Sequence, residues 1–266
     1  MFKYLKGEKM LKKFLVLMLS ITLLLTMVTG CGSDQTSKPV EDGEVFTYAM
    51  SGTYKPFNYK ENGDLVGFDV EIAEAIAEKM GYKGTPKITP WETILEGLKI
   101  GKYDAIIGSM AITEERAKQV DFSIPYYRSG AQIFVMNDNS EINSVDDLKG
   151  KKIGVVKSST FGDVARDYSE EVKEYASDVL ALQDLPTGRI DAVITDQIVG
   201  LVAKQENGLE IKEVGEPLWV DEMAIPVEKG NKELLDKINN ALEEIIEDGT
   251  YEKISEKWFG KSILGE

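Results

Sequence analysis

The sequence predicts an α/β fold of two lobes, each a mixed sheet flanked by helices, joined by two crossings of the chain. Three observations support this prediction. From Glu44 onward, short apolar runs alternate with amphipathic stretches, a pattern typical of strands and helices in turn. A nine-residue pattern occurs twice at a domain-sized interval. Two extended apolar runs lie where the chain would pass between the lobes.

The repeated pattern relates residues 101–109 to residues 188–196 at a constant offset of 87. Each copy has a glycine, a basic residue, an apolar residue, aspartate, alanine and two β-branched residues. This order predicts a helix end, a tight turn, a buried strand and a loop at the strand's carboxyl end. Because ligands of open α/β sheets bind outside those ends, the last residues of the two copies, Ser109 and Asp196, are candidate ligand contacts.

Two apolar runs mark the predicted crossings. One covers residues 131–136 and the other covers residues 223–227. They place lobe 1 at residues 45–130 plus 228–266 and lobe 2 at residues 131–227. The first lobe is then built from both ends of the mature chain.

Capping residues predict where two helices of the first lobe begin. Asp69 is expected to be the N-cap of a helix that ends at Gly81. Thr89 and Glu92 have the spacing of a capping box, with Pro90 at the first position of a second helix.

Three further helices follow from the same rules. Thr113 is expected to cap another helix, with Glu114, Glu115 and Arg116 in its first turn. Near the C-terminus, amphipathic spacing predicts a long helix from about Lys232 to Glu247 and a shorter one from about Tyr251 to Trp258.

The N-terminus has the pattern of a secretory signal peptide, here residues 1–30. Lys12 and Lys13 precede an apolar run over residues 14–28, and small residues then lead to Cys31. The alternative is a membrane-anchoring helix, but the run is shorter than the roughly 20 residues that a spanning helix needs.

Cys31 is the only cysteine of the chain, so no internal disulfide forms. Its position directly after the small residues resembles the bacterial lipobox. That resemblance implies acylation of Cys31 and anchoring of the mature chain at the extracellular face of the cytoplasmic membrane, for which more than one acyl chain is needed. The alternative is a secreted protein with a free thiol. Residues 31–44 are expected to form a flexible tether.

Composition excludes several classes of function. The first thirty residues hold five Lys and one Glu, so the remaining 236 residues carry 26 Lys and Arg against 45 Asp and Glu, a net charge of −19. Such a surface repels nucleic acid and anionic lipid. The chain has no histidine, which removes Ser-His-Asp and Cys-His nucleophile systems and the commonest transition-metal ligand. No cofactor or metal is therefore expected.

Seven stretches are similar, in the same order, to stretches of the family 3 extracellular solute-binding proteins, which serve polar amino acid ABC transporters. They are GTYKPF (52–57), GFDVEIA (67–73), GKYD (101–104), ITEER (112–116), VDFSIPYY (120–127), DLKG (147–150) and DAVITD (191–196). The resemblance covers about Val45 to Gly260. It implies the periplasmic-binding-protein-like type II fold, with two hinge crossings between the lobes.

The resemblance also implies how a free L-amino acid would be held. Arg116 corresponds to the family's carboxylate-binding arginine, and a planar guanidinium suits a carboxylate. The Thr160 hydroxyl and the Phe161 N–H correspond to further carboxylate contacts at a helix start. Asp196 corresponds to the aspartate that pairs with the ligand ammonium. From spacing alone, Arg116 would be a surface arginine on a capped helix, and Asp196 would be a helix N-cap.

Four more positions follow from the resemblance. Ser109 corresponds to a carbonyl acceptor for the ligand ammonium. Ala111 stands where the family usually has Ser or Thr, so that it offers its backbone N–H but no hydroxyl. Tyr54 and Trp91 correspond to aromatic residues that flank the ligand side chain, although composition alone would place such rings in the core.

Two residues bear on the charge of the ligand. Ser51 stands where several relatives that bind cationic ligands carry an aspartate. Lys157, close to the expected pocket, would repel a cation unless it points to solvent. Together they favour a neutral polar or sulfur-containing amino acid, such as one resembling cystine.

The expected function is capture of an amino acid by closure of the cleft, and delivery to the permease of an ABC importer by a monomeric, lipid-anchored protein. Contacts from both lobes would stabilise the closed form. Two alternatives use the same fold. A cyclohexadienyl dehydratase-like lyase could use carboxylates and Lys157 as acids and bases. A sensory ectodomain would normally continue into a transmembrane segment, whereas the sequence stops at Glu266.

Overall fold

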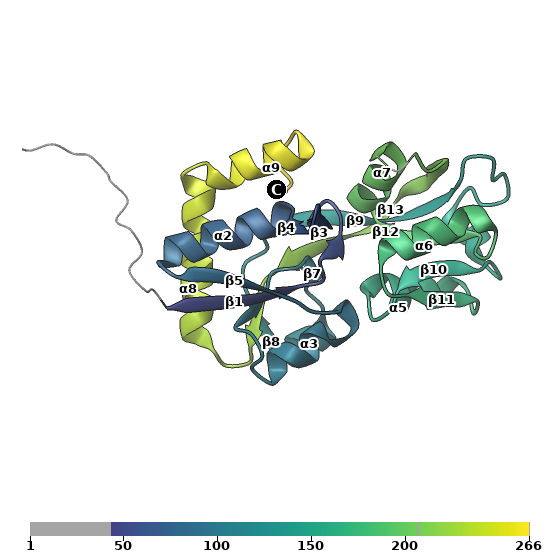
Figure 1. Ribbon diagram of the computed structural model, residues 1–266. Helices are drawn as coiled ribbons and strands as arrows, with labels where there is room; N and C mark the ends of the chain where they lie inside the picture. Colours follow the sequence, from purple (N-terminus) through teal and green to yellow (C-terminus); the bar gives the residue numbers. More distant parts are fainter. Residues whose placement is uncertain (1–43, 207, 266) are drawn as a thin grey trace, which may run out of the picture. The chain divides into compact units, whose positions relative to one another are not determined.

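The computed structural model describes residues 44–206 and 208–265. The expected signal peptide, Cys31 and all of the expected tether except Glu44 lie outside the described residues. Figure 1 shows the described strands gathered into two main sheets and one small sheet. Among the helices of this part of the chain, none is long and apolar enough to cross a membrane.

The first sheet contains five strands, with parallel and antiparallel neighbours. They are β1 (Val45–Met50), β5 (Lys83–Ile88), β6 (Ala105–Ile106), β8 (Val120–Phe122) and β14 (Pro226–Glu228). Their order is β5-β1-β6-β14-β8. β1 is parallel to β5 and β6, whereas β14 is antiparallel to β6 and β8. The sheet is therefore mixed, and it includes strands from both ends of the described chain.

Helices cover both faces of this sheet. They are α2 (Phe68–Met80), α3 (Trp91–Lys99), α8 (Lys232–Glu247) and α9 (Thr250–Phe259). Side chains alternate between the faces of a strand. Tyr48 and Met50 of β1 pack in the cluster that contains α2 and α8, whereas Ala49 packs with Ile94 and Leu98 of α3. Figure 1 shows α2 and α3 on opposite faces accordingly.

The second sheet contains six strands in the order β11-β10-β12-β9-β13-β7. They are β7 (Met110–Ala111), β9 (Tyr127–Met136), β10 (Ile153–Val156), β11 (Val172–Tyr175), β12 (Ala192–Asp196) and β13 (Ile211–Ala224). β10 is parallel to β11 and β12, and the other pairings are antiparallel. Helix α5 (Thr160–Tyr168) packs on one face, whereas α6 (Asp178–Asp184) and α7 (Gln197–Glu206) pack with the side chains of the other face.

The remaining elements are short. They are the hairpin strands β2 (Thr53–Tyr54), β3 (Asn58–Glu61) and β4 (Asp64–Val66), the helix α4 (Glu114–Ala117) and the 3-10 helices η1 (Val145–Leu148) and η2 (Leu185–Thr187). β2, β3 and β4 form the small antiparallel sheet.

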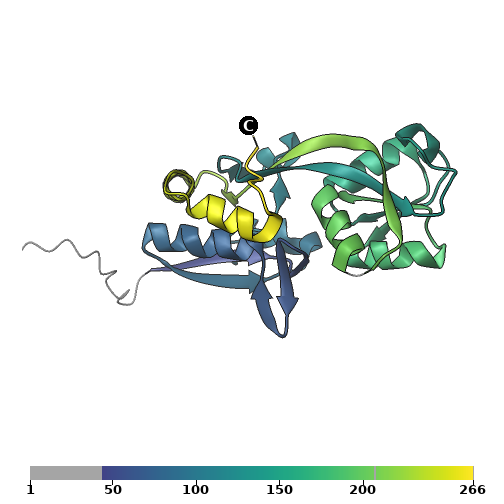
Figure 2. The same ribbon diagram turned by 90° about the horizontal axis from the view of Figure 1, so that it is seen from above.

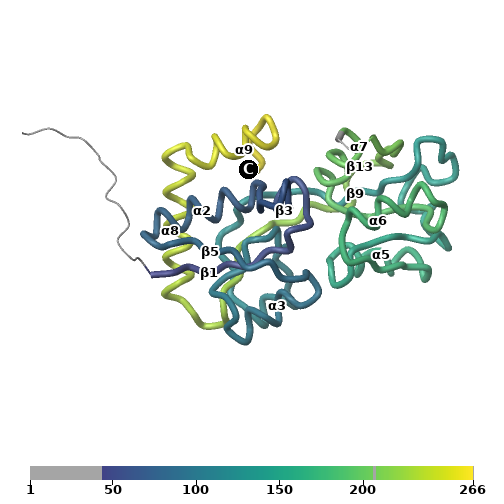
Figure 3. Tube along the Cα trace, in the orientation of Figure 1, coloured from purple at the N-terminus to yellow at the C-terminus, as the bar shows by residue number. Residues whose placement is uncertain are grey.

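Two long strands carry the chain from one main sheet to the other. After β8 of the first sheet the chain enters β9 of the second, and after β13 it returns to the first sheet in β14. β9 and β13 pair antiparallel with each other, and Figure 2 shows them as two adjacent extended ribbons. The runs predicted as crossings, residues 131–136 and 223–227, lie in or beside these strands. Figure 3 shows the blue helix α2 reaching the yellow-green helix α8, and α2 contacts both α8 and α9 near the C-terminus.

Both copies of the sequence repeat form the predicted turn and buried strand. The glycine of each copy has a left-handed φ, 69° and 71° respectively, and β6 or β12 follows. Asp104 accepts the N–H of Thr47 in β1 at 2.7 Å, and Asp191 accepts the N–H of Lys152 just before β10 at 2.8 Å. The repeated aspartate thus fastens each strand to the start of its parallel neighbour.

The prediction that Asp69 is an N-cap is wrong. The N-cap of α2 is Gly67, and no side chain caps the helix. The N–H groups of Phe68 and Asp69 donate instead to the carbonyls of Pro56 at 3.1 Å and Phe57 at 2.8 Å. The approach is so close that a Cβ on Gly67, where φ is 133°, would lie 2.1 Å from the Phe57 oxygen. Because backbone carbonyls accept these N–H groups at the helix start, the Asp69 carboxylate is not needed as a cap and points into the core.

The predicted capping box at Thr89 and Glu92 is also wrong. α3 begins at Trp91 with Pro90 as its N-cap, and no side chain caps it. The N–H of Thr89 donates to the Met50 carbonyl at 3.0 Å, so Thr89 continues the pairing of β5 with β1. Tertiary pairing of the strand therefore overrides the local capping pattern.

The other helix predictions are confirmed. The Thr113 hydroxyl accepts the N–H of Arg116 at 3.1 Å and begins α4. Gly81 ends α2 with a left-handed φ of 72°. α8 has the predicted bounds, and α9 extends the predicted range by one residue at each end.

Candidate ligand-binding site

A cavity of about 550 Å³, measured with its open mouth, is lined by residues that flank both main sheets. Seven of the eight predicted ligand contacts lie on its wall, and these are Tyr54, Trp91, Ser109, Ala111, Arg116, Thr160 and Phe161. Asp196 is not among the lining residues. The polar part of the wall also includes Ser51, Thr53, Ser159, Ser177 and Asp178.

Arg116 places a cationic group on the wall of this cavity. Its Nη1 donates to the Ala111 carbonyl at 2.9 Å, and its Nη2 donates to the Ser158 carbonyl at 3.4 Å. The guanidinium lies 5.6 Å from the ring centroid of Trp91. Burial lowers the pKa of Arg116. Since both hydrogen bonds go to neutral carbonyls, the guanidinium is suited to a carboxylate in the cavity.

The N-terminus of α5 opens on the same cavity. The Ser159 hydroxyl caps it by accepting the N–H of Gly162 at 3.2 Å. The first N–H groups of a helix have no partner within the helix, which makes those of Thr160 and Phe161 suitable for an anion. The Thr160 hydroxyl donates to Asp221 at 3.2 Å, so its proton points to Asp221. We therefore expect Thr160 to offer its N–H, rather than its hydroxyl, to a ligand.

Asp196 has the capping role that its spacing predicts. Its carboxylate accepts the N–H groups of Ile198 at 2.8 Å and Val199 at 3.4 Å at the start of α7. The residue is 1% exposed. Burial raises the pKa of Asp196 to about 7, and hydrogen bonds from Ser129 and the two N–H groups oppose this rise.

Asp178 is a candidate functional residue that the sequence analysis missed. It is the first residue of α6, it is 5% exposed, and it lines the cavity. The Thr195 hydroxyl donates to its carboxylate. Burial raises the pKa of Asp178 to about 6, and hydrogen bonds from Thr195 and from its own N–H oppose this rise. In the sequence, Ser177 and Asp178 indicate only a helix start, so nothing local showed that this carboxylate faces a ligand site.

Ser109 is held in place by a buried hydrogen-bond network. It has a left-handed φ of 60°. Its hydroxyl donates to Asp69 and its N–H donates to the Tyr126 hydroxyl, both at 2.9 Å. Asp69 also accepts hydrogen bonds from Asn58 and Tyr126, both at 2.7 Å. Because both donors of Ser109 are engaged within the protein, its carbonyl is the group it can offer to a ligand.

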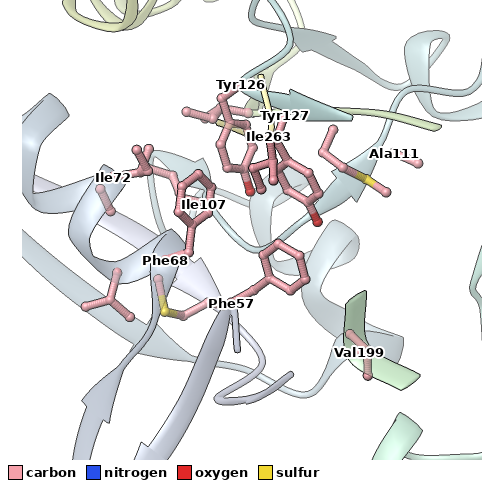
Figure 4. Close-up of a cluster of buried hydrophobic side chains, with 14 of the residues drawn as sticks. Phe57, Phe68, Ile72, Ile107, Ala111, Tyr126, Tyr127, Val199 and Ile263 are labelled. Carbon is pink, nitrogen blue, oxygen red and sulfur yellow. The ribbon is translucent and has the colours of Figure 1, made fainter. Parts of the chain in front are cut away.

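Tyr54 and Trp91 both line the cavity, and they have different neighbours. The Tyr54 ring stacks on Phe57 with centroids 5.2 Å apart, and Figure 4 shows Phe57 facing Tyr127 in the core behind it. Burial raises the pKa of Tyr54, and the charges of nearby aspartates raise it further. The Trp91 indole N–H donates to the Ser158 carbonyl at 3.4 Å. Tyr54 therefore lies in the field of carboxylates, and Trp91 lies beside the guanidinium of Arg116.

The two residues considered for ligand charge are both engaged within the protein. The Ser51 hydroxyl donates to Asn58 at 3.0 Å, and Ser51 lines the cavity. Lys157 does not line the cavity, and its Nζ lies 2.6 Å from a Glu92 oxygen. The positive charge of Lys157 is thus matched outside the cavity wall. Within the described residues, no group of His, Cys, Asp or Glu could hold a metal ion.

Two α/β lobes with a cavity that is lined from both, and whose wall carries Arg116 and Asp178, define a two-lobed solute-binding protein. The chain belongs to the bacterial extracellular solute-binding proteins, family 3, whose family model matches residues 46–261. The predicted fold class and the family resemblance are therefore confirmed.

Relatives and solved structures agree with this assignment. The chain is 36% identical over 262 residues to the probable amino-acid-binding protein YxeM of Bacillus subtilis (strain 168), covering 96% of this chain and 98% of that protein. It is 35% identical over 228 residues to the L-cystine-binding protein TcyJ of Escherichia coli (strain K12), covering 84% and 86%. An ancestral arginine-binding protein bound to arginine is 46% identical with a TM-score of 0.78, covering 83% of this chain and all of that one.

Proposed function

We propose that this protein captures a free L-amino acid outside the cytoplasmic membrane and delivers it to the permease of an ABC importer. The observation that carries the proposal is the position of Arg116 on the cavity wall together with the N-terminus of α5. These groups provide a guanidinium and helix N–H groups for one carboxylate. The named relatives bind amino acids, which supports the same ligand class for this chain.

The ligand's α-carbon would be held by both of its charged groups. Arg116 and the N–H groups of Thr160 and Phe161 would bind the carboxylate. The Ser109 carbonyl and Asp196 would accept the ammonium, with Asp196 retaining its helix-capping bonds through its other lone pairs. Ala111, Tyr54 and Trp91 would complete the wall around the side chain. A buried zwitterion needs partners for both charges, because an unpaired buried charge costs several kcal/mol.

Closure of the two lobes on the ligand is part of this proposal. With lobe 1 at residues 45–130 plus 228–266 and lobe 2 at residues 131–227, Arg116 belongs to the first lobe and Thr160 to the second. A ligand that contacts both is bound fully only when the cleft is closed, so it stabilises the closed form. The crossings along β9 and β13 are natural hinges, and the permease would recognise the closed form.

Anchoring and location complete the proposal. Acylation of Cys31 would hold a monomeric protein at the extracellular face of the cytoplasmic membrane, on the periplasmic side where an outer membrane is present. The proposed ligand is a free L-amino acid, without a further restriction on its side chain. The pairing of Lys157 with Glu92 removes one of the two arguments for a neutral polar or sulfur-containing side chain.

A thermal-shift screen of the purified protein against the common amino acids and cystine tests the proposal. A true ligand at 100 times its dissociation constant stabilises the protein by about 2.7 kcal/mol. Arg116→Ala should abolish this shift, because the ligand carboxylate loses its charged partner. Arg189→Ala is the matched control, since that exposed arginine pairs with Asp184 and does not line the cavity.

Three results would contradict the proposal. One is that no amino acid raises the melting temperature. Another is that Arg116→Ala leaves the ligand shift intact. The third is that the bound compound is recovered chemically changed, which would support the lyase alternative.

A further inference from the structure

Three carboxylates are buried close to Tyr54, and they differ in how well they are satisfied. Asp69 accepts three hydrogen bonds from side chains. Asp196 accepts two backbone N–H groups and a serine hydroxyl. Asp178 accepts the Thr195 hydroxyl and its own backbone N–H. Asp178 therefore has the fewest donors, and of the three it is the one that lines the cavity.

Asp178 and Arg116 both line the cavity, but their hydrogen bonds go to other groups: Arg116 donates to the carbonyls of Ala111 and Ser158, and Asp178 accepts the Thr195 hydroxyl. Asp178 begins α6, which contacts β2, the strand that carries Tyr54. The charge of Asp178 acts on Tyr54. Different carboxylates act on Arg116, namely Glu115 on α4, Asp163 on α5 and Asp221 on β13. The cavity wall thus carries a cationic group at Arg116 and an anionic group at Asp178.

We propose that Asp178 binds a cationic group at the far end of the ligand's side chain, so that the ligand is an L-amino acid with a second nitrogen cation. This inference rests on the amino-acid binding proposed above, with Arg116 at the α-carboxylate. A guanidinium or ammonium at Asp178 supplies charge-assisted hydrogen bonds to a carboxylate that has few donors. The side chain then passes the Tyr54 ring, whose face attracts cations.

The charges around Asp178 favour a cation over a neutral side chain. A buried carboxylate without a counter-ion is unfavourable. Among the described residues, no lysine or arginine forms an ion pair with Asp178, and Lys157 pairs with Glu92. Ser51 is neutral and already donates to Asn58. In this proposal the carboxylate that meets the ligand side chain is Asp178, at the start of α6, and not a residue at position 51.

The test compares ligands that share a shape and differ in one charge. Isothermal titration of the purified protein measures the dissociation constants of arginine against citrulline, of lysine against 2-aminoheptanoic acid, and of cystine against the mixed disulfide of cysteine with 3-mercaptopropionic acid, which lacks one ammonium group. The cationic member of at least one pair should bind roughly 10- to 100-fold more tightly, the range of a hydrogen bond to a charged group. In Asp178→Asn this ratio should fall below about threefold, while the neutral member keeps its affinity.

Asp163→Asn is the matched control. Asp163 is an exposed aspartate near Arg116 that pairs with Arg166 and does not line the cavity. This variant removes the same charge and should keep the wild-type ratio. The ligand pairs test the inference on the wild-type protein even if Asp178→Asn does not fold.

Two outcomes overturn the inference while amino-acid binding stands. In one, the wild-type protein binds the neutral member of every pair as tightly as the cationic one. In the other, Asp178→Asn weakens both members equally, which would place Asp178 at the α-ammonium or give it a purely structural role. Failure to bind any amino acid would instead refute the proposed function itself, and this inference with it.

Discussion

The Nζ of Lys157 lies 2.6 Å from an Oε1 atom of Glu92, joining the loop after β10 to the first turn of α3. Beside this ion pair, the Trp91 indole and the Arg116 guanidinium both donate to the Ser158 carbonyl. These contacts connect the two lobes at the rim of the cavity. Contacts within the protein therefore help to hold together the residues that line the cavity.

Glu92→Gln should weaken ligand binding, because it removes an ion pair that would favour the closed form proposed above. The two side chains are about half exposed, and exposed pairs contribute about 0.2–1 kcal/mol. The dissociation constant should rise by about 1.5- to 5-fold at low salt, and the difference should vanish near 1 M salt. Titration calorimetry at two salt concentrations measures both effects.

Glu96→Gln is the control for this prediction. Glu96 lies on the same helix and pairs with Lys99 within that helix, so its loss should leave ligand affinity unchanged. Equal affinities of wild type and Glu92→Gln at low salt would show that the ion pair does not bias closure.

Asp69→Asn should destabilise the protein, since the three donors that meet this carboxylate would face an amide. Asn58, Ser109 and Tyr126 all donate to it, and an amide NH₂ can accept none of their hydrogen bonds. A loss of about 1–3 kcal/mol in the free energy of unfolding is expected, measured by urea denaturation. Asp64→Asn, at an exposed position, should change stability little. An undiminished stability of Asp69→Asn would show that the network contributes nothing.

Tyr127→Phe should leave stability unchanged or raise it. Among the described residues the Tyr127 hydroxyl is buried without a hydrogen-bond partner, and removing an unsatisfied group relieves its desolvation penalty. The ring would still stack on Phe57, with centroids 4.8 Å apart. The neighbouring Tyr126 is the natural comparison, because its hydroxyl bonds to Asp69 and Ser109. Tyr126→Phe should cost about 1–3 kcal/mol, and an equal effect of the two changes would contradict this account.

Stability should fall as pH rises from about 4 to about 7. Burial raises the pKa of Asp69 and Asp178 to about 6 and that of Asp196 to about 7. Across this window the folded state binds more protons than the unfolded state, so the free energy of unfolding decreases with pH. Asp184 and Asp248 have lowered pKa values, so they change the free energy of unfolding only at pH values below this window.

Urea denaturation between pH 5 and pH 7.5 measures this dependence. A decrease of more than about 1 kcal/mol is expected, and Asp178→Asn should make the curve flatter because one of the three groups no longer titrates. A free energy of unfolding that rises steadily with pH over the same range would refute the assignment of raised pKa values to these carboxylates.

Local patterns predicted much of the fold, and they failed where a partner distant in sequence took over. The helix at Lys232–Glu247 has the bounds that its amphipathic spacing predicts, because spacing and capping depend on residues a few positions apart. Thr89 and Glu92 have capping-box spacing as well. Thr89 nevertheless pairs with β1 and Glu92 pairs with Lys157, 65 positions away. The partners, Met50 in β1 and Lys157 after β10, are brought close to Thr89 and Glu92 only by the tertiary fold.

The candidate site shows the same division. Arg116 and Trp91, which the family resemblance made candidate ligand contacts, line the cavity. Asp178 was missed, because a Ser-Asp pair at a helix start is common and indicates no ligand. Nothing in the sequence distinguishes its carboxylate from those of other helix starts.

By itself, the sequence determined the α/β alternation, the repeated turn and strand, and the family to which the chain belongs. These depend on residue types and spacings within short segments. Only the tertiary structure decided which carboxylate faces the cavity, that the charge of Lys157 is matched by Glu92, and that Asp69 is a buried acceptor instead of a cap. The physical reason is that burial, charge pairing and hydrogen-bond satisfaction depend on which segments meet in space.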